Sequence, residues 1–217
     1  MPTMHKKKHY LIVAVTLIAC ALIGIRIWWV NATRIETPEQ TFSMNEEVKL
    51  NGAFIDDISE DTNGYSLTVK SAQVMSANEY LKRYSRDGVT SVEGGDVPNT
   101  RVVLEVEFKN SGKKDGGNFN YISSWVIGKP NKNAFYRTDS ELWEHRETKL
   151  AGTMYTGVGI KGGTTYTTYL PFYMLDDSPE FFKPNSATGS EYAVIKEKEF
   201  YYLVATKPQR MVVDIHV

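Results

Sequence analysis

An uninterrupted apolar run near the N-terminus constrains this chain more than any other feature of its sequence. It covers the 21 residues from Tyr10 to Val30, among which Arg26 is the one charged side chain. A helix of that length rises about 30 Å, the hydrocarbon thickness of a bilayer. Arg26 lies within reach of the headgroups, and Trp28 and Trp29 suit the aromatic belt at the membrane interface. The run therefore predicts a single transmembrane helix over residues 10–30.

The charges that flank the run predict its orientation. Three lysines, Lys6 to Lys8, precede it, whereas Arg34 on the far side is followed by Glu36 and Glu39. Positive charge favours the cytoplasmic side of a membrane. We therefore expect a single-pass protein of the cell membrane, with residues 1–9 as a cytoplasmic basic tail and the C-terminal part of the chain extracytoplasmic.

Cys20, the one cysteine of the chain, lies inside this run. The residues before it, Leu17-Ile18-Ala19, resemble a bacterial lipobox, in which the cysteine is lipidated after cleavage. The run stays apolar from Ala21 to Ile25, however, where a mature lipoprotein usually turns polar. We therefore favour an uncleaved signal anchor, with lipidation at Cys20 and ordinary signal cleavage as the alternatives.

The rest of the chain is acidic and free of cysteine. The first 34 residues hold five of the 25 Lys and Arg and none of the 26 Asp and Glu, so residues 35–217 carry 20 basic and 26 acidic groups, a formal net charge of −6. That balance disfavours nucleic acid as a partner, because such binding needs concentrated positive charge. Without disulfides, the outer part must be stabilised by its hydrophobic core.

Strand patterns dominate after the apolar run. The polar residues 31–46 predict a short stalk, and residues 47–217 predict an extracytoplasmic β-domain. The clearest strand is 101–109, where apolar and polar side chains alternate. The Asn63-Gly64 pair predicts a type I′ turn between a strand run over 48–58 and a strand over 65–74. Further strands are expected at 121–128, 134–137, 164–174, 192–196, 200–206 and 211–217, and short helices at 77–84 and 140–147.

Many short strands without βαβ alternation predict a mainly β fold, a β-sandwich with one or two short helices. The segments "TFSMNEEVKLNG", "NGYSLTVKSAQVMSANEYLKRY", "RVVLEVEFKNSG", "TYLPF" and "FYYLVATKPQRMVVDI" occur in that order. In this order they resemble uncharacterised membrane-anchored families of mostly Gram-positive bacteria, whose outer domain is similar to the telokin-like, immunoglobulin-type sandwich. The resemblance covers residues 41–217. It implies an immunoglobulin-like fold and a surface location, and carries over no catalytic residue.

Metal-binding patterns in the outer domain are weak. His145 and His216 are its two histidines, and without a cysteine they do not make up a zinc site, so we expect no metal or cofactor. The oxygen-rich stretch from Asp56 to Asn63 resembles a calcium loop in part, but it lacks the late bidentate glutamate. A solvated hairpin tip explains the same residues more simply, and Ca²⁺ binding there stays open.

Two further groups of residues are candidates for function. Asp176, Asp177 and Glu180 could act as paired carboxylates on a glycan, but the Ser-Pro pair and the two phenylalanines beside them favour an ordinary loop, so we expect no catalytic residue. Tyr166 and Tyr169 lie three apart in "TTYTTYLPFY", which places them on opposite faces of a strand and predicts that one of them is exposed. Exposed tyrosines suit sugar stacking and protein interfaces, so both are candidate partner-binding aromatics.

The sequence as a whole predicts a non-catalytic binding or accessory module at the cell envelope. Its expected partners are the membrane, through residues 10–30, and an unknown protein or cell-wall component. One alternative is a cell-wall hydrolase that uses loop carboxylates such as Asp176 and Glu180. The other is a structural subunit of a membrane complex.

Overall fold

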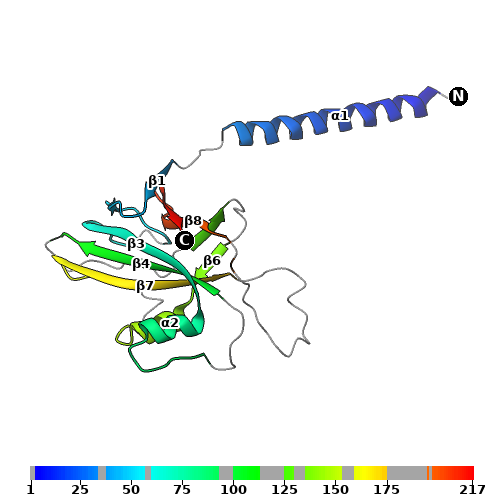
Figure 1. Ribbon diagram of the computed structural model, residues 1–217. Coiled ribbons are helices and arrows are strands. Elements are labelled where there is room, and N and C mark those ends of the chain that lie inside the picture. Colours follow the sequence, from blue (N-terminus) through cyan, green and yellow to red (C-terminus); the bar gives the residue numbers. More distant parts are fainter. Residues whose placement is uncertain are drawn as a thin grey trace. The chain divides into compact units, whose positions relative to one another are not determined.

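The computed structural model describes residues 3–33, 38–56, 60–92, 100–112, 125–129, 135–152, 159–174, 195 and 197–217. Side chains are described from residue 12 onward, Met174 excepted. The chain forms two compact units, residues 1–36 and residues 37–217. The first unit is a helix and the second is a β-domain with two short helices (Figure 1).

Helix α1 extends over Thr3–Ala32. Its segment Ile12–Ala32 has 21 residues, a mean hydropathy of 2.2 and no buried share, so it is long and apolar enough to cross a membrane. Cys20 is exposed on this helix. The core helix of a soluble protein would be mostly buried, whereas an exposed apolar helix near the N-terminus fits a membrane anchor or a signal sequence.

The described strands of the β-domain form one nine-stranded sheet, which confirms the mainly β prediction. The sheet order is β1-β9-β8-β5-β6-β7-β4-β3-β2. The β1–β9 pairing is parallel and the other pairings are antiparallel. The bounds are β1 Glu39–Ser43, β2 Val48–Lys49, β3 Tyr65–Ser76, β4 Thr100–Asn110, β5 Trp125–Lys129, β6 Phe135–Thr138, β7 Thr164–Met174, β8 Glu199–Ala205 and β9 Arg210–His216.

This sheet is nearly closed into a barrel. Strands β1 and β2 lie at opposite ends of the sheet order, yet residues 44–47 alone connect them. A chain advances at most about 3.6 Å per residue, so the two edges of the sheet must curve toward each other. The backbone N–H of Asn45 donates to the carbonyl of Val69 on β3 at 2.9 Å, which ties the connecting turn to the β2 side.

One hydrophobic core fills the interior of the sheet, and every strand contributes to it. Strand β4 shows the alternation that the sequence predicts, because Val102, Leu104, Val106 and Phe108 are each 0% exposed. The adjacent Val103 points to the other face, where a second cluster forms. The β-domain therefore buries residues on both faces of β3, β4 and β7.

The two predicted short helices are confirmed, and they cover the outer face of the sheet beside β3 and β7 (Figure 1). Helix α2 extends over Ala77–Tyr84 and begins with a capping box between Ser76 and Glu79. Helix α3 extends over Ser140–Arg146, and the Asp139 side chain accepts from the N–H of Leu142 as its N-cap.

Two local predictions are wrong. Residues 39–43 were expected in the stalk, but they form strand β1, where Phe42 is the one buried residue. An edge strand that buries a single side chain shows no regular alternation of apolar and polar residues, so its sequence does not reveal it. The expected strand at 53–58 is also absent from its described residues, and β3 pairs instead with β2, through Val48 opposite Leu67.

The prediction of a type I′ turn at Asn63-Gly64 is also wrong, and this turn type occurs at the other Asn-Gly pair of the region, Asn51-Gly52. Asn51 has φ 50° and Gly52 has φ 86°, and the N–H of Ala53 donates to the carbonyl of Leu50 at 2.8 Å. At the expected position, Gly64 has a positive φ of 82° but Asn63 does not, and the backbone N–H of Tyr65 donates to the carbonyl of Thr62. That pattern is typical of a type II turn.

These two glycines provide a matched prediction. A Cβ on Gly64 would lie 3.1 Å from the backbone nitrogen of Gly112, whereas one on Gly52 would lie 3.5 Å from a side-chain oxygen of Asn63. We expect Gly52→Ala to cost about 1–2 kcal/mol of unfolding free energy, since both glycines have positive φ. Gly64→Ala should cost roughly 3 kcal/mol or more, because rigid backbone crowds it as well. Equal losses in urea unfolding of the detergent-solubilised chain would contradict this reasoning.

Candidate functional site

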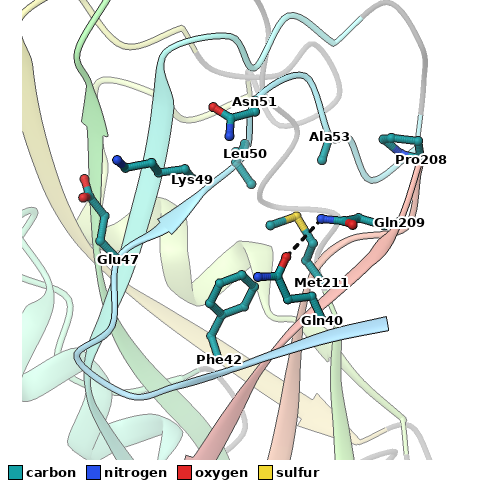
Figure 2. A pocket seen from close by; sticks show the side chains of 10 residues that line it. All are labelled: Gln40, Phe42, Glu47, Lys49, Leu50, Asn51, Ala53, Pro208, Gln209 and Met211. Atoms are coloured by element: carbon teal, nitrogen blue, oxygen red, sulfur yellow. Dashed lines mark hydrogen bonds between the residues drawn. The ribbon is translucent and has the colours of Figure 1, made fainter. Parts of the chain in front are cut away.

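A groove lies where the two edges of the sheet approach each other. Its volume is about 480 Å³. The lining residues come from β1, from β2 and the residues on either side of it, and from the β8–β9 turn with the start of β9 (Figure 2). They are Gln40, Phe42, Glu47, Lys49, Leu50, Asn51, Ala53, Pro208, Gln209 and Met211.

The inner wall of the groove is apolar. Phe42, Leu50, Ala53 and Met211 are between 2% and 8% exposed. Figure 2 shows the sulfur of Met211 between the side chains of Phe42 and Leu50. Two parts of the chain that are far apart in the sequence, residues 42–53 and the start of β9, therefore share this wall.

The rim of the groove is polar and mostly uncharged. It holds three carboxamides, Gln40, Asn51 and Gln209. The amide nitrogen of Gln209 donates to the side-chain oxygen of Gln40 at 3.1 Å (Figure 2). Since a carboxamide both donates and accepts, this rim suits a ligand that carries neutral hydrogen-bonding groups.

Glu47 and Lys49 supply the charge at the rim. The hydroxyl of Ser66 donates to the Glu47 carboxylate at 2.7 Å, and this hydrogen bond, aided by Lys109 and Lys49, lowers the pKa of Glu47. Glu47 is therefore a carboxylate at neutral pH. The Nζ of Lys109 lies 3.9 Å from Glu47 on the side of β4, so positive charge flanks that carboxylate.

The backbone edges of β1 and β2 face this groove. The N–H of Arg210 on β9 donates to the carbonyl of Pro38 at 2.8 Å, so Pro38, and with it Gln40, directs its backbone groups toward β9. Because backbone direction alternates along a strand, Glu39 and Thr41 direct theirs to the open edge. Just after β2, the backbone N–H of Leu50 donates to the carbonyl of Tyr65 on β3, so Lys49 directs its backbone groups the other way, to the open edge.

Tyr166 and Tyr169 lie on opposite faces of β7, as predicted, but neither is exposed. Tyr166 packs against the core beside Phe108, with ring centroids 6.4 Å apart. Tyr169 stacks on Tyr84 of α2 at 4.1 Å and lies under the guanidinium of Arg146 at 5.2 Å. Burial raises the pKa of Tyr169. Both rings are half-buried, and a role for them in partner binding stays a prediction.

The two histidines of the β-domain, His145 and His216, lie apart from the groove lining. His145 Nδ1 is 2.7 Å from Asp87 Oδ2, and hydrogen bonding to His145, followed by that to Ser85, holds the pKa of Asp87 well below its usual range. This contact joins the segment after α2 to α3. His216 is exposed near the end of β9, 3.7 Å from Asp214.

The acidic candidates show no catalytic or metal arrangement among the residues that the structure places. Glu60 accepts from the backbone N–H of Asp56 at 2.9 Å, and Asp61 accepts from Asn63, so these carboxylates cap the backbone of their own loop. No group of three or more His, Cys, Asp and Glu that could hold a metal occurs within the described ranges. Asp176, Asp177 and Glu180 lie outside the described residues.

The groove was not predicted from the sequence, because two of its lining residues, Gln40 and Phe42, lie in the expected stalk. A signal was present: Phe42, Met44, Val48 and Leu50 are all even-numbered, which is the period-two pattern of strands. The polar residues between them obscured it. The contribution of Gln209 and Met211 carried no local signal, since the β1–β9 pairing brings them there.

Comparisons with known proteins give a family for this chain and assign no chemistry to it. The profile of a family described as "Domain of unknown function (DUF5028)" matches residues 39–211, which are 173 of the 217 residues. The match begins at Glu39, where β1 begins. No curated protein matches significantly. A crystal structure of an uncharacterised β-sandwich protein from Clostridium difficile 630 is similar with a TM-score of 0.40 and 9% identity, over 84% of this chain and 97% of that one.

Proposed function

This chain belongs to the DUF5028 family of domains of unknown function, and we propose that it is a membrane-anchored, non-catalytic binding domain at the outer face of the cell membrane. Its ligand site is the groove between β1 and β2. The groove itself is the observation that carries the proposal. Its volume of about 480 Å³ is in the usual range of ligand sites, and an apolar wall with a few polar groups at the rim is their usual composition.

The anchor and its orientation are supported by the helix and its flanks. Helix α1 provides 21 apolar residues, enough to cross the bilayer. Lys6 to Lys8 precede this segment, which favours a cytoplasmic N-terminus and an outer β-domain. In this proposal the helix is uncleaved, and Cys20 is a small apolar residue within it.

An immunoglobulin-like sandwich is our proposal for the finer architecture of the β-domain. The two halves of the nine-stranded sheet enclose a common core, to which both β3 and β8 contribute. Aligned packing of two sheet faces around such a core is typical of sandwiches.

Binding rather than catalysis is supported by the chemistry of the groove. Of its ten lining residues, Glu47 and Lys49 are the titratable ones, and Glu47 is engaged by Ser66. General acid-base catalysis usually places a titratable pair of matched pKa in a shielded site. Both of these side chains are exposed, so they suit the recognition of a ligand.

The orientation is tested by labelling cysteines on intact cells with a membrane-impermeant maleimide. Lys149 is exposed in the β-domain, and a Lys149→Cys variant of the full chain should be labelled without permeabilisation. The wild-type chain, whose single Cys20 lies within the apolar helix, should not be labelled. A Thr3→Cys variant should be labelled after permeabilisation alone. The reverse pattern for Lys149→Cys and Thr3→Cys would overturn the proposed orientation.

The ligand site is tested by filling the groove. Gln40→Trp places an indole at an exposed lining position without altering the core. Thr165→Trp is the matched control, since Thr165 is exposed on β7 and does not line the groove. The detergent-solubilised full chain is screened against defined peptides, cell-wall oligosaccharides and acylated probes. Binding that Gln40→Trp abolishes and Thr165→Trp leaves unchanged supports the proposal. No binding by any class, or binding insensitive to Gln40→Trp, overturns it.

A further inference from the structure

We infer that the groove takes an extended polypeptide segment, which pairs with the open edge of β1 as an additional strand. This inference rests on the proposed function and adds the class of ligand. Addition of a strand to a free sheet edge is a recurrent mode of peptide recognition, in which the backbone supplies affinity and alternate side chains supply specificity. Three properties of the groove support it.

The first property is an open backbone edge that borders the groove. Glu39 and Thr41 direct their N–H and carbonyl groups away from β9, because Pro38 and Gln40 direct theirs toward it. Ser43, the next residue of this series, is satisfied within the turn: its N–H donates to the Glu46 carboxylate at 2.9 Å, and its carbonyl accepts from the Glu46 N–H at 3.2 Å. Within the described residues, the unpaired donors and acceptors of β1 are therefore those of Glu39 and Thr41, just outside this turn.

The second property is that β2 does not close this edge. The chain of pairings from β1 through the sheet makes β1 and β2 antiparallel, which is the arrangement of a hairpin. Beyond the Ser43–Glu46 turn, however, no backbone hydrogen bond joins β1 to β2 in the described part of the chain. Strand β2 ends at Lys49, and the Asn51-Gly52 turn leads the chain away. The space along β1 is left to the groove.

The third property is the wall that an added strand would meet. Side chains of a strand alternate between faces, so every second residue of the peptide would point inward, beside Gln40 and Phe42 of β1. That position faces Leu50 and Met211 and suits an apolar side chain. The carboxamides of Gln40 and Gln209 are hydrogen-bonded to each other at the rim beside this wall (Figure 2).

Free sheet edges are usually blocked by charge, proline or a covering segment, because an unpaired edge promotes aggregation. Here the groove side of β1 carries an apolar wall at its base and neutral amides at its rim. This composition favours a strand as occupant over a strongly anionic ligand. An oligosaccharide would use the amides, but it would leave the alternating backbone groups of Glu39 and Thr41 without a matching partner.

The experiment uses the detergent-solubilised full chain and a synthetic library of eight-residue peptides in which apolar residues alternate with Ser and Thr. The best binder is resynthesised with single N-methyl groups at each position. N-methylation of every second residue, whose N–H would bond to β1, should weaken binding about tenfold or more. N-methylation of the residues between them, whose N–H groups point away from β1, should weaken binding less than about threefold. Hydrogen exchange of the Glu39 and Thr41 amides should slow at least tenfold when the peptide binds.

A pair of variants at one position isolates the backbone contribution. Thr41→Pro removes the open N–H of β1, and proline is tolerated at a position whose N–H faces away from the ladder. We expect this variant to lose peptide binding at least tenfold, whereas Thr41→Ala, which keeps the N–H, should bind within about twofold of wild type. A thermal melt shows whether Thr41→Pro folds, and the N-methyl series gives the same answer without altering the protein.

The outcomes separate this inference from the proposed function. Groove-dependent binding of oligosaccharides but not of peptides overturns the inference and leaves the binding function standing. Peptide binding without alternation in the N-methyl series also overturns the inference. Protection of Thr41 that rises with protein concentration in the absence of peptide overturns it in favour of a second copy of the chain. No groove-dependent binding of any probe overturns both.

Discussion

Replacing Asp139 with alanine is expected to lower the free energy of unfolding of the β-domain by about 3–5 kcal/mol. Asp139 Oδ2 lies 2.7 Å from Arg101 Nε, and the two side chains are 8% and 3% exposed. Removing the carboxylate leaves a buried guanidinium without the counter-charge at its Nε, and the desolvation cost of that charge persists. The same substitution removes the N-cap of α3, since Asp139 Oδ1 accepts from the N–H of Leu142 at 3.2 Å.

Two control variants separate the contributions of charge, cap and exposure. Asp139→Asn keeps a good N-cap and loses the charge, so it should retain the part of the stability that is due to the cap, about 1 kcal/mol. Glu107→Ala breaks the Lys70–Glu107 pair, whose side chains are 39% and 36% exposed, and should cost less than about 1 kcal/mol. Urea unfolding followed by near-ultraviolet circular dichroism measures all three. If Asp139→Ala lowered the free energy of unfolding no more than Glu107→Ala, burial would not explain the strength of the Arg101–Asp139 pair.

Trp143→Ala is expected to destabilise the β-domain by about 3–5 kcal/mol. Trp143 on α3 is 0% exposed and belongs to the main core, so its removal leaves a large cavity. Its indole N–H donates to the hydroxyl of Thr168 at 3.1 Å, and that hydroxyl donates to the buried Glu147 carboxylate at 2.9 Å. The substitution therefore also removes one end of a buried hydrogen-bond chain.

A phenylalanine at the same position separates the ring from its hydrogen bond. Trp143→Phe keeps most of the apolar volume and loses the N–H, and should cost about 1–2 kcal/mol. Trp125→Ala is the exposed comparison: Trp125 is 36% exposed and contacts Phe135 edge-on at 6.2 Å. Its loss should stay near 1 kcal/mol. Comparable melting temperatures for Trp143→Ala and Trp125→Ala would contradict the burial of Trp143.

Elements with a strong local pattern were predictable from the sequence. The strand at 164–174 and the helix at 77–84 have the predicted bounds, and the strand at 101–109 extends by one residue at each end. In each case the apolar period and the flanking cap or turn residues agree with the structure. At these elements the local sequence preferences and the tertiary packing favour the same backbone conformation.

The candidate site could not be predicted, because its geometry depends on non-local pairing. Two Asn-Gly pairs occur within 14 residues of chain, and both sequences permit a type I′ turn. The pairing of Val48 with Leu67 decides between them, since it places the tight turn at Asn51. In the same way, the mostly polar residues Glu39–Ser43 form strand β1 because β9 supplies hydrogen-bond partners for their backbone.

The parallel pairing of β1 with β9 has a consequence for the order in which the domain assembles. Glu39 pairs with Arg210, 171 positions later, so β1 cannot join the sheet until β9 has been synthesised. A chain is synthesised from its N-terminus, and contacts of such long range form slowly. The groove, which needs Gln209 and Met211, is therefore among the last features to form during biogenesis. A chain whose translation stopped before Gln209 would therefore lack one side of this groove.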